Sequence, residues 1–199
     1  MEHAAAAHGH GEENHVESFE RARLAMWLFL ASEIMMFGAF IAAYVVLWTS
    51  APGGDGTAFD KHHLSWKIAC FNTIVLILSS YTIVRAVNAV SKGNKRHAED
   101  MMVLTAFLGL VFLGVKSYEY SLKFEHDIGP GTNVFFGAYF LMTGFHGVHV
   151  LIGVIAILWG AFYVKHTSPQ RYAYVENLAL YWHLVDVIWI FLFPIVYLL

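Results

Sequence analysis

Charged residues and cysteine are both scarce in this chain. Of its 199 residues, 14% are charged and 58% are apolar, and there is one cysteine. A soluble domain has about 25% charged and 45–50% apolar residues, so this excess of apolar side chains argues against a single water-soluble core. The lone thiol, Cys70, cannot form an internal disulfide and is expected to act as a small apolar residue. The chain has no basic block and a formal net charge of −3, which argues against a nucleic-acid partner.

The chain contains five long apolar runs. Each approaches or exceeds the ~20 residues needed to cross about 30 Å of hydrocarbon, and none alternates as barrel strands do. The pattern predicts an all-α polytopic membrane protein, in which residues 21–199 form one domain, a bundle of five transmembrane helices. We expect the helices at Leu24–Trp48, Ile68–Val90, Met101–Tyr120, Val134–Val164 and Leu178–Leu199.

The remaining segments are short and polar. Turn residues mark the four connections, at 51–56, Gly93-Asn94, Gly129-Pro130-Gly131 and Ser168-Pro169. Because the connections are short, we expect successive helices to be antiparallel neighbours. Residues 1–20 lack the apolar region of a secretory signal and are rich in histidine, so we expect a polar, disordered tail.

The cationic residues predict an orientation. With the N-terminus in the cytoplasm, eight of the twelve cationic residues lie on the cytoplasmic side: Arg21, Arg23, Arg85, Lys92, Lys95, Arg96, Lys165 and Arg171. The other four are Lys61, Lys67, Lys116 and Lys123. The positive-inside rule therefore predicts a cytoplasmic N-terminus and a periplasmic C-terminus. Arg85 and Lys116 lie toward helix ends, and we expect both to reach the membrane surface as anchors.

Glu33 is an ionisable residue deep in the first apolar run. An ionisable side chain in hydrocarbon costs about 2.5–3.5 kcal/mol and usually faces protein or water. Nine residues at 1.5 Å each place Glu33 about 14 Å deep, near the midplane. It is a candidate for proton transfer or for a specific lipid or subunit contact. The alternative is a carboxyl group that only hydrogen-bonds a neighbouring helix.

His146 and His149 lie one turn apart on the fourth helix and share a face. Two histidines at this spacing can begin a metal site, but no cysteine or carboxylate pair accompanies them. Structural hydrogen bonding is therefore the favoured interpretation. Glycines along the same helix indicate close helix packing; they lie at 137, 144, 147, 153 and 160.

The last helix carries Glu176, His183 and Asp186 along one stripe. His183 and Asp186 can pair at i,i+3, which would offset the burial of both. By depth, this pair, Glu33 and the two histidines of the fourth helix could form a single polar seam.

Six histidines are expected on the cytoplasmic side, at His3, His8, His10, His15, His97 and His166. Histidine ordinarily titrates close to neutral pH, so the group could collect protons near an uptake mouth. The alternatives for the tail are adventitious metal binding or a solvated segment with no defined task. We find no combination of histidines that would ligate haem or copper.

Several segments together resemble subunit III of the haem-copper respiratory oxidases, in its short five-helix bacterial form. They are Trp27–Glu33 with Met36-Phe37, Phe71-Asn72-Thr73, Lys95-Arg96-His97, Ser117–Tyr120, Thr143–Val150 and Tyr181–Trp189. The resemblance spans roughly residues 20–199, and the last two segments are the most specific. Glu33 matches the family's intramembrane glutamate. His146, His149, Glu176, His183 and Asp186 match positions in its signature segments. The resemblance implies that all six residues are structural or lipid-linked and that none is catalytic.

This resemblance implies a subunit with no catalytic residue, metal or cofactor of its own, in a multi-pass position in the bacterial inner membrane. Haem and copper are expected in partner subunits, and phospholipid is expected to bind this chain. The implied partners are subunit I directly, then subunit II and small subunits or a respiratory supercomplex. The complex would take electrons from cytochrome c, reduce oxygen to water and pump protons, with this chain supporting proton uptake and durability.

Four alternatives remain open at this stage. Within the family, the chain could belong to a quinol oxidase or to a nitric oxide reductase. From a different class, a small proton-coupled transporter would use Glu33 and Asp186, although we find no inverted repeat or paired broken helices. An assembly factor is the fourth. Proton flux in liposomes that contain the chain alone would identify a transporter, and we expect none.

Overall fold

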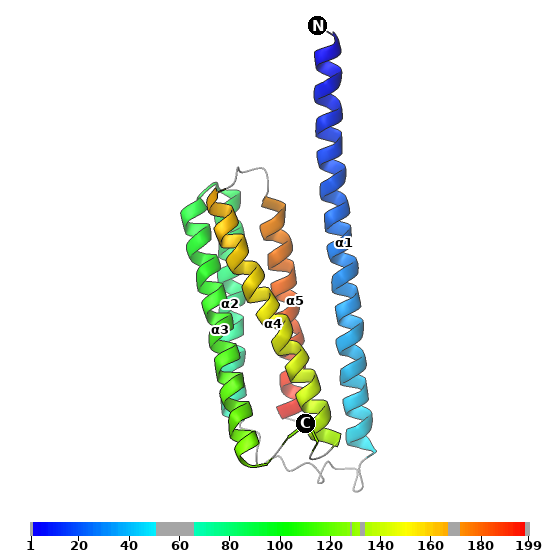
Figure 1. The fold of residues 1–199 in the computed structure, drawn as a ribbon, viewed down its shortest axis with the longest axis vertical. Coiled ribbons are helices and arrows are strands. Elements are labelled where there is room, and N and C mark those ends of the chain that lie inside the picture. The colour runs from blue at the N-terminus through cyan, green and yellow to red at the C-terminus, as the bar shows by residue number, and fades with distance from the viewer. Residues whose placement is uncertain (1, 51–65, 128, 132–133, 167–171, 198–199) are drawn as a thin grey trace.

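Five α-helices make up the structure. The computed structural model describes residues 2–50, 66–127, 129–131, 134–166 and 172–197, with side chains from residue 21 onward except 165–166 and 172–173. The helices are α1 (Glu2–Thr49), α2 (Trp66–Ser91), α3 (Lys95–Glu125), α4 (Val134–His166) and α5 (Tyr172–Tyr197), shown in Figure 1. All five are long and apolar enough to cross a membrane. The predicted five-helix, all-α multi-pass architecture is therefore confirmed.

The helices extend beyond the apolar runs that predicted them. α3 begins at Lys95 instead of Met101 and ends at Glu125 instead of Tyr120. Its start is capped by Asn94, whose side chain accepts a hydrogen bond from the backbone N–H of His97. Gly93, at φ 74°, provides the tight turn after α2. A helix ends where its backbone groups find a cap, which need not coincide with the end of its apolar run.

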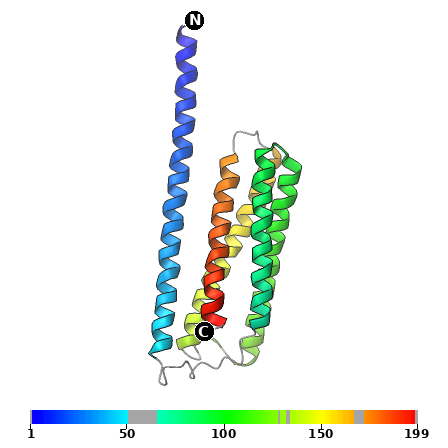
Figure 2. The ribbon, with the colours of Figure 1, turned by 180° about the vertical axis from the view of Figure 1, so that it is seen from behind.

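Residues 2–20 differ from the expected disordered tail. Their backbone continues α1, which extends beyond the ends of the other helices (Figures 1 and 2). Two features favour the longer helix. Ala4–Ala7 is a run of the strongest helix former. The membrane span also supplies a nucleus onto which further turns can be added without a new nucleation cost.

The neighbours of α1 differ from those expected. From α2 onward, each helix packs against the next one in the chain, as predicted. α2 also packs against α5, which closes the bundle. By contrast, α1 packs against α4 and α5, and stands at one side of the bundle in Figure 2. Residues 51–65, which follow α1, lie outside the described part of the chain. A connection of this length can reach past an adjacent helix, so sequence order does not impose adjacency here.

Two tryptophans of α5 occupy the centre of the bundle. Trp182 and Trp189 are fully buried. A Cβ atom added at Gly109 of α3 would lie 2.7 Å from the Trp182 ring, and one added at Gly153 of α4 would lie 2.9 Å from it. Only glycine leaves room for the indole at these two positions. The expectation of close packing through α4 glycines is confirmed at Gly153, whereas nothing lies within 4 Å of a Cβ atom at Gly144.

Candidate functional site

Glu33 and His149 meet between α1 and α4. Glu33 Oε2 lies 3.0 Å from His149 Nε2, and each side chain is 13% exposed. The two atoms are in close contact, but the contact does not meet hydrogen-bond geometry. Phe37 covers the imidazole edge-on, with ring centroids 5.4 Å apart. The structure thus brings together two residues that are far apart in the sequence and were singled out separately.

The other nitrogen of His149 is bonded to the backbone of its own helix. Nδ1 lies 2.8 Å from the carbonyl oxygen of Phe145. Because a carbonyl only accepts, Nδ1 must carry the hydrogen and donate it. Nε2 is therefore the ring nitrogen that faces Glu33 across the gap between α1 and α4.

Ser80 of α2 joins His183 to Asp186. Its hydroxyl donates to Asp186 Oδ2 in a short hydrogen bond. Since that hydroxyl has one hydrogen, His183 Nδ1, 2.9 Å away, donates to Ser80 Oγ. The expected direct pairing of His183 with Asp186 is therefore replaced by a bridge through a third residue. Asp186 Oδ1 is buried and has no hydrogen-bond partner among the described residues.

His146 lies in an aromatic environment instead of a polar one. It is fully buried, and its ring stacks on Trp189 at 5.1 Å and meets the edge of Phe112 at 5.6 Å. Neither ring nitrogen has a hydrogen-bond partner within the described structure. The expected hydrogen bonding of the two α4 histidines is thus confirmed for His149 and wrong for His146. In the described residues, no three His, Cys, Asp or Glu side chains come close enough to hold a metal ion.

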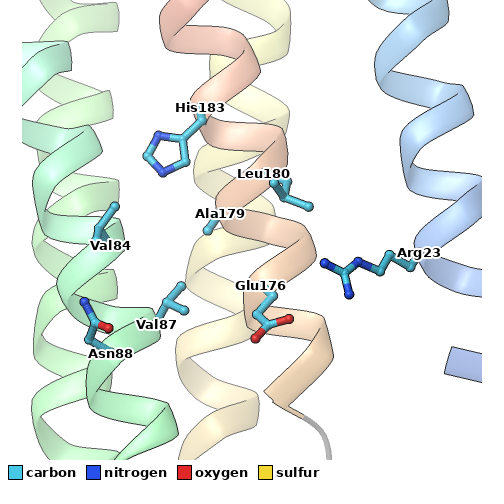
Figure 3. A pocket seen from close by; sticks show the side chains of 8 residues that line it. All are labelled: Arg23, Val84, Val87, Asn88, Glu176, Ala179, Leu180 and His183. Atoms are coloured by element: carbon cyan, nitrogen blue, oxygen red, sulfur yellow. The ribbon is translucent and has the colours of Figure 1, made fainter. Parts of the chain in front are cut away.

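The expected single seam is divided into separate sites. Glu33 contacts α4, His183 and Asp186 contact α2, and His146 lies among aromatic rings of α3 and α5. Glu176 adjoins the site that contains His183. It lines a cavity of about 330 Å³ together with Arg23, Asn88 and His183 (Figure 3). The prediction of one seam used only the depth of each residue in the membrane. The residues lie on helix faces that pack against different neighbours, so they do not all meet.

The candidate proton-collecting histidines are only partly described. His97 is half-buried at the start of α3 and lines a second cavity, with Arg85, Lys92 and Asn94. The side chains of His3, His8, His10, His15 and His166 lie outside the described residues. Their backbones belong to the first part of α1 and to the last residue of α4.

A buried ionic cluster was missed by the sequence analysis. Lys116, Glu119 and Lys123 are 6%, 4% and 3% exposed, and both ammonium groups contact the Glu119 carboxylate, at 3.0 and 2.9 Å. Tyr197 accepts a hydrogen bond from Lys116 and donates one to Glu119, which ties the end of α5 to α3.

The expected role of Lys116 as a surface anchor is therefore wrong, whereas Arg85 is exposed as expected. The spacing at 116, 119 and 123 places all three cluster residues on one helix face, and this was the available signal.

The comparisons with known proteins cover almost the whole chain. The family model for cytochrome c oxidase subunit III matches residues 4–199. This chain is a member of that family. A cytochrome c oxidase subunit 3 of Thermostichus vulcanus is 37% identical over 185 residues, which cover 88% of this chain and 86% of the relative. One of Synechocystis is 33% identical over 198 residues, covering 97% and 80%.

Relatives of this chain also include third subunits of quinol oxidases. The quinol oxidase subunit 3 of Bacillus spizizenii is 30% identical over 204 residues, which cover 100% of this chain and 98% of the relative. The resemblance noted from the sequence is thus confirmed, and the chain is a subunit III of the haem-copper oxidases. Burying ionisable groups in a membrane is costly, and the paired Glu33–His149 and the bridged His183–Ser80–Asp186 are two of the polar sites that this chain keeps there.

Proposed function

We propose that this chain is the subunit III of a proton-pumping cytochrome c oxidase that reduces oxygen to water. The observation that carries the proposal is the family match over residues 4–199. The relatives at 37% and 33% identity, both named cytochrome c oxidase subunit 3, favour the cytochrome c branch. The bacterial inner membrane is the location that we assign to it.

Its first role is to pack against the catalytic subunit I and shield one side of it. Support comes from the apolar surface that the isolated chain presents. On α1, which packs only on its α4 and α5 side, exposed apolar side chains include Trp27, Leu28, Ile34 and Met35. Within a membrane, such a face contacts either lipid or another subunit. We assign haem and copper to subunits I and II, and bound phospholipid to this chain.

A second role is support of proton uptake. The structure places the start of α1, the start of α3 and the end of α4 at the same end of the bundle (Figure 1). These segments carry the six candidate histidines, and we propose that they collect protons on the cytoplasmic side. Replacing all six by glutamine is expected to slow proton uptake by the complex near neutral pH. An unchanged uptake rate would remove this role and leave the packing role.

One purification tests the main proposal. Mild detergent extraction through a tag on this chain is expected to recover subunits I and II in stoichiometric amount, with the absorption spectrum of a haem protein. Recovery of the chain without haem-bearing subunits would contradict the proposal.

A quinol oxidase is the second candidate, because the Bacillus spizizenii relative matches along its whole length. The electron donor separates the two branches. The purified complex is expected to oxidise reduced cytochrome c, and its subunit II is expected to carry a copper-binding cysteine motif. Oxidation of quinol alone would favour the second candidate.

A further inference from the structure

The second cavity lies where the chain turns from α2 into α3. It has a volume of about 290 Å³, and Arg85, Asn88 and Lys92 line it from the side of α2. Asn94 and His97 line it from the start of α3. Ligand pockets in proteins usually measure about 300–1,000 Å³, so a cavity of this volume suits a small ligand.

The turn between the two helices is fixed by its own backbone. Gly93, at φ 74°, adopts the left-handed conformation, and the N–H of Asn94 donates to the carbonyl oxygen of Ala89. The Asn94 side chain then caps α3 by accepting from the N–H of His97. The backbones of Lys92, Asn94 and His97 are therefore held in place relative to one another without a ligand.

Arg85 is held by Tyr81, one turn earlier on α2. Its Nη1 donates to the Tyr81 hydroxyl at 2.9 Å, and the guanidinium carbon lies 5.8 Å from the centre of the Tyr81 ring. A guanidinium has five N–H donors, and contacts within the described structure use one of those on Arg85. The remaining donors can bind an oxyanion through two parallel hydrogen bonds, with little further loss of conformational freedom.

The cationic groups of this cavity are not neutralised by neighbouring acids. Arg85 and Lys92 are cationic, and no carboxylate is among the described residues that line the cavity. The Lys92 ammonium group forms no ion pair within the described part of the chain. Cations gathered around one space raise the local concentration of anions, most strongly of those with more than one charge.

The position of the cavity favours a water-soluble anion over a lipid. Lys92 and Asn94 lie in the turn, outside the two apolar spans Trp66–Ser91 and Lys95–Glu125. Among the described lining residues, Ala89 is the one apolar side chain. An acyl chain would therefore find little apolar surface here, whereas a hydrated anion can enter from the aqueous phase.

We propose that this cavity binds a small, multiply charged phosphate anion of the size of pyrophosphate. Arg85 binds one phosphate group through two N–H donors, and Lys92 neutralises a further negative charge. The side-chain amides of Asn88 and Asn94 can donate additional hydrogen bonds. The inference does not depend on the proposed packing or proton-uptake roles.

The test is the binding of radiolabelled pyrophosphate to the purified oxidase complex that contains this chain. The complex is held in nanodiscs of phosphatidylcholine, and equilibrium dialysis at constant ionic strength gives the dissociation constant. We expect saturable binding to which this cavity contributes one site per complex. Sulfate should compete for the site, whereas chloride at the same ionic strength should not.

Two variants identify the contacts. Arg85→Gln should weaken binding at this site about tenfold, the effect of losing one charge-assisted contact, and Lys92→Gln should weaken it in the same direction. Arg96→Gln is the matched control, because it removes an exposed cation from the first turn of α3 that does not line the cavity. The affinity of this control should equal that of the unmodified complex.

Unchanged affinity in Arg85→Gln would overturn the proposal. An equal loss in Arg96→Gln would also overturn it, since general surface charge would then be responsible. The haem spectrum of each preparation reports separately on subunit assembly, so a failure of this proposal leaves the proposed function standing.

A lipid occupant is tested in nanodiscs that also contain phosphatidylglycerol. After extraction in mild detergent, Arg85→Gln should retain as much phosphatidylglycerol as the unmodified complex, measured by mass spectrometry. A loss of phosphatidylglycerol in Arg85→Gln but not in Arg96→Gln would overturn the proposal, because a lipid headgroup would then occupy the cavity.

Discussion

Several polar side chains inside this bundle contact partners on other helices. Ser80 contacts two residues of α5, and Glu33 of α1 contacts His149 of α4. In a medium without water, a polar group that loses its partner keeps the whole cost of its burial. Single substitutions at these contacts should therefore have large effects for their size.

Ser80→Ala tests the bridge between α2 and α5. It removes the hydroxyl that accepts from His183 and donates to Asp186, so a buried carboxyl loses its one partner in the described structure. We expect a loss of about 1–3 kcal/mol in the free energy of unfolding, measured by mixed-micelle titration. Ser91→Ala is the control, because its exposed hydroxyl bonds only its own helix. Equal effects of the two variants would contradict the bridge.

The Glu33–His149 contact is tested by two substitutions at one position. Glu33→Gln retains an amide that can donate to His149 Nε2, so we expect stability within about 0.5 kcal/mol of the original. Glu33→Leu leaves the imidazole without that contact and should cost about 1–3 kcal/mol. Ser32→Ala, next to it, removes only a bond to its own helix and serves as the control. If the leucine variant is as stable as the glutamine variant, the contact is not stabilising.

The buried Lys116–Glu119–Lys123 cluster should be the most sensitive of these sites. Glu119→Gln leaves two buried ammonium groups without a carboxylate, and breaking a buried ion pair in this way costs about 3–5 kcal/mol. Glu125→Gln, exposed at the end of the same helix, should change stability by less than about 0.5 kcal/mol. Unfolding titrations of both variants compare the two losses, and a cost below 1 kcal/mol at Glu119 would mean that the cluster relaxes to reach water.

At the level of helices, α4 approaches α3 and α5 through glycines that differ in what they face. Gly153→Ala would place a methyl group 2.9 Å from the Trp182 ring, so the indole or the helix must move. We expect a cost of about 1–3 kcal/mol from overpacking. Gly144→Ala meets nothing within 4 Å and should be neutral or stabilising, since alanine favours helix. Thermal unfolding of both variants distinguishes local packing from general helix propensity.

For the molecule as a whole, the two ends of the bundle face opposite sides of the membrane. The predicted orientation is tested by single cysteines in a Cys70→Ala background. Lys92→Cys, beside the α2–α3 turn, should react with an impermeant maleimide only after the membrane is opened. His126→Cys, at the far end of α3, should react in intact cells. The reverse labelling pattern would place the N-terminus outside.

A feature could be predicted from the sequence when it depends on one continuous stretch of the chain. A membrane span is one continuous apolar run, so all five helices could be predicted. Their observed ends differ from the predicted ones because caps such as Asn94 determine where a helix begins. Glu33 and His149 were recognised as candidates because an ionisable residue in an apolar run is conspicuous. Ser80 and the Lys116 cluster were not recognised, because a serine is common in such helices and a lysine near a helix end usually reaches water.

The amino-acid sequence alone determined the helical class, the five crossings and the family. These depend on apolar run length and on short motifs, which need no knowledge of neighbours. Only the tertiary structure decided which buried groups meet, since Ser80 lies 103 residues from His183 in the chain. The tertiary structure also showed that α1 packs against α4 and α5. Depth in a membrane can be counted along one helix, but the direction of a side chain depends on which helix packs against that face.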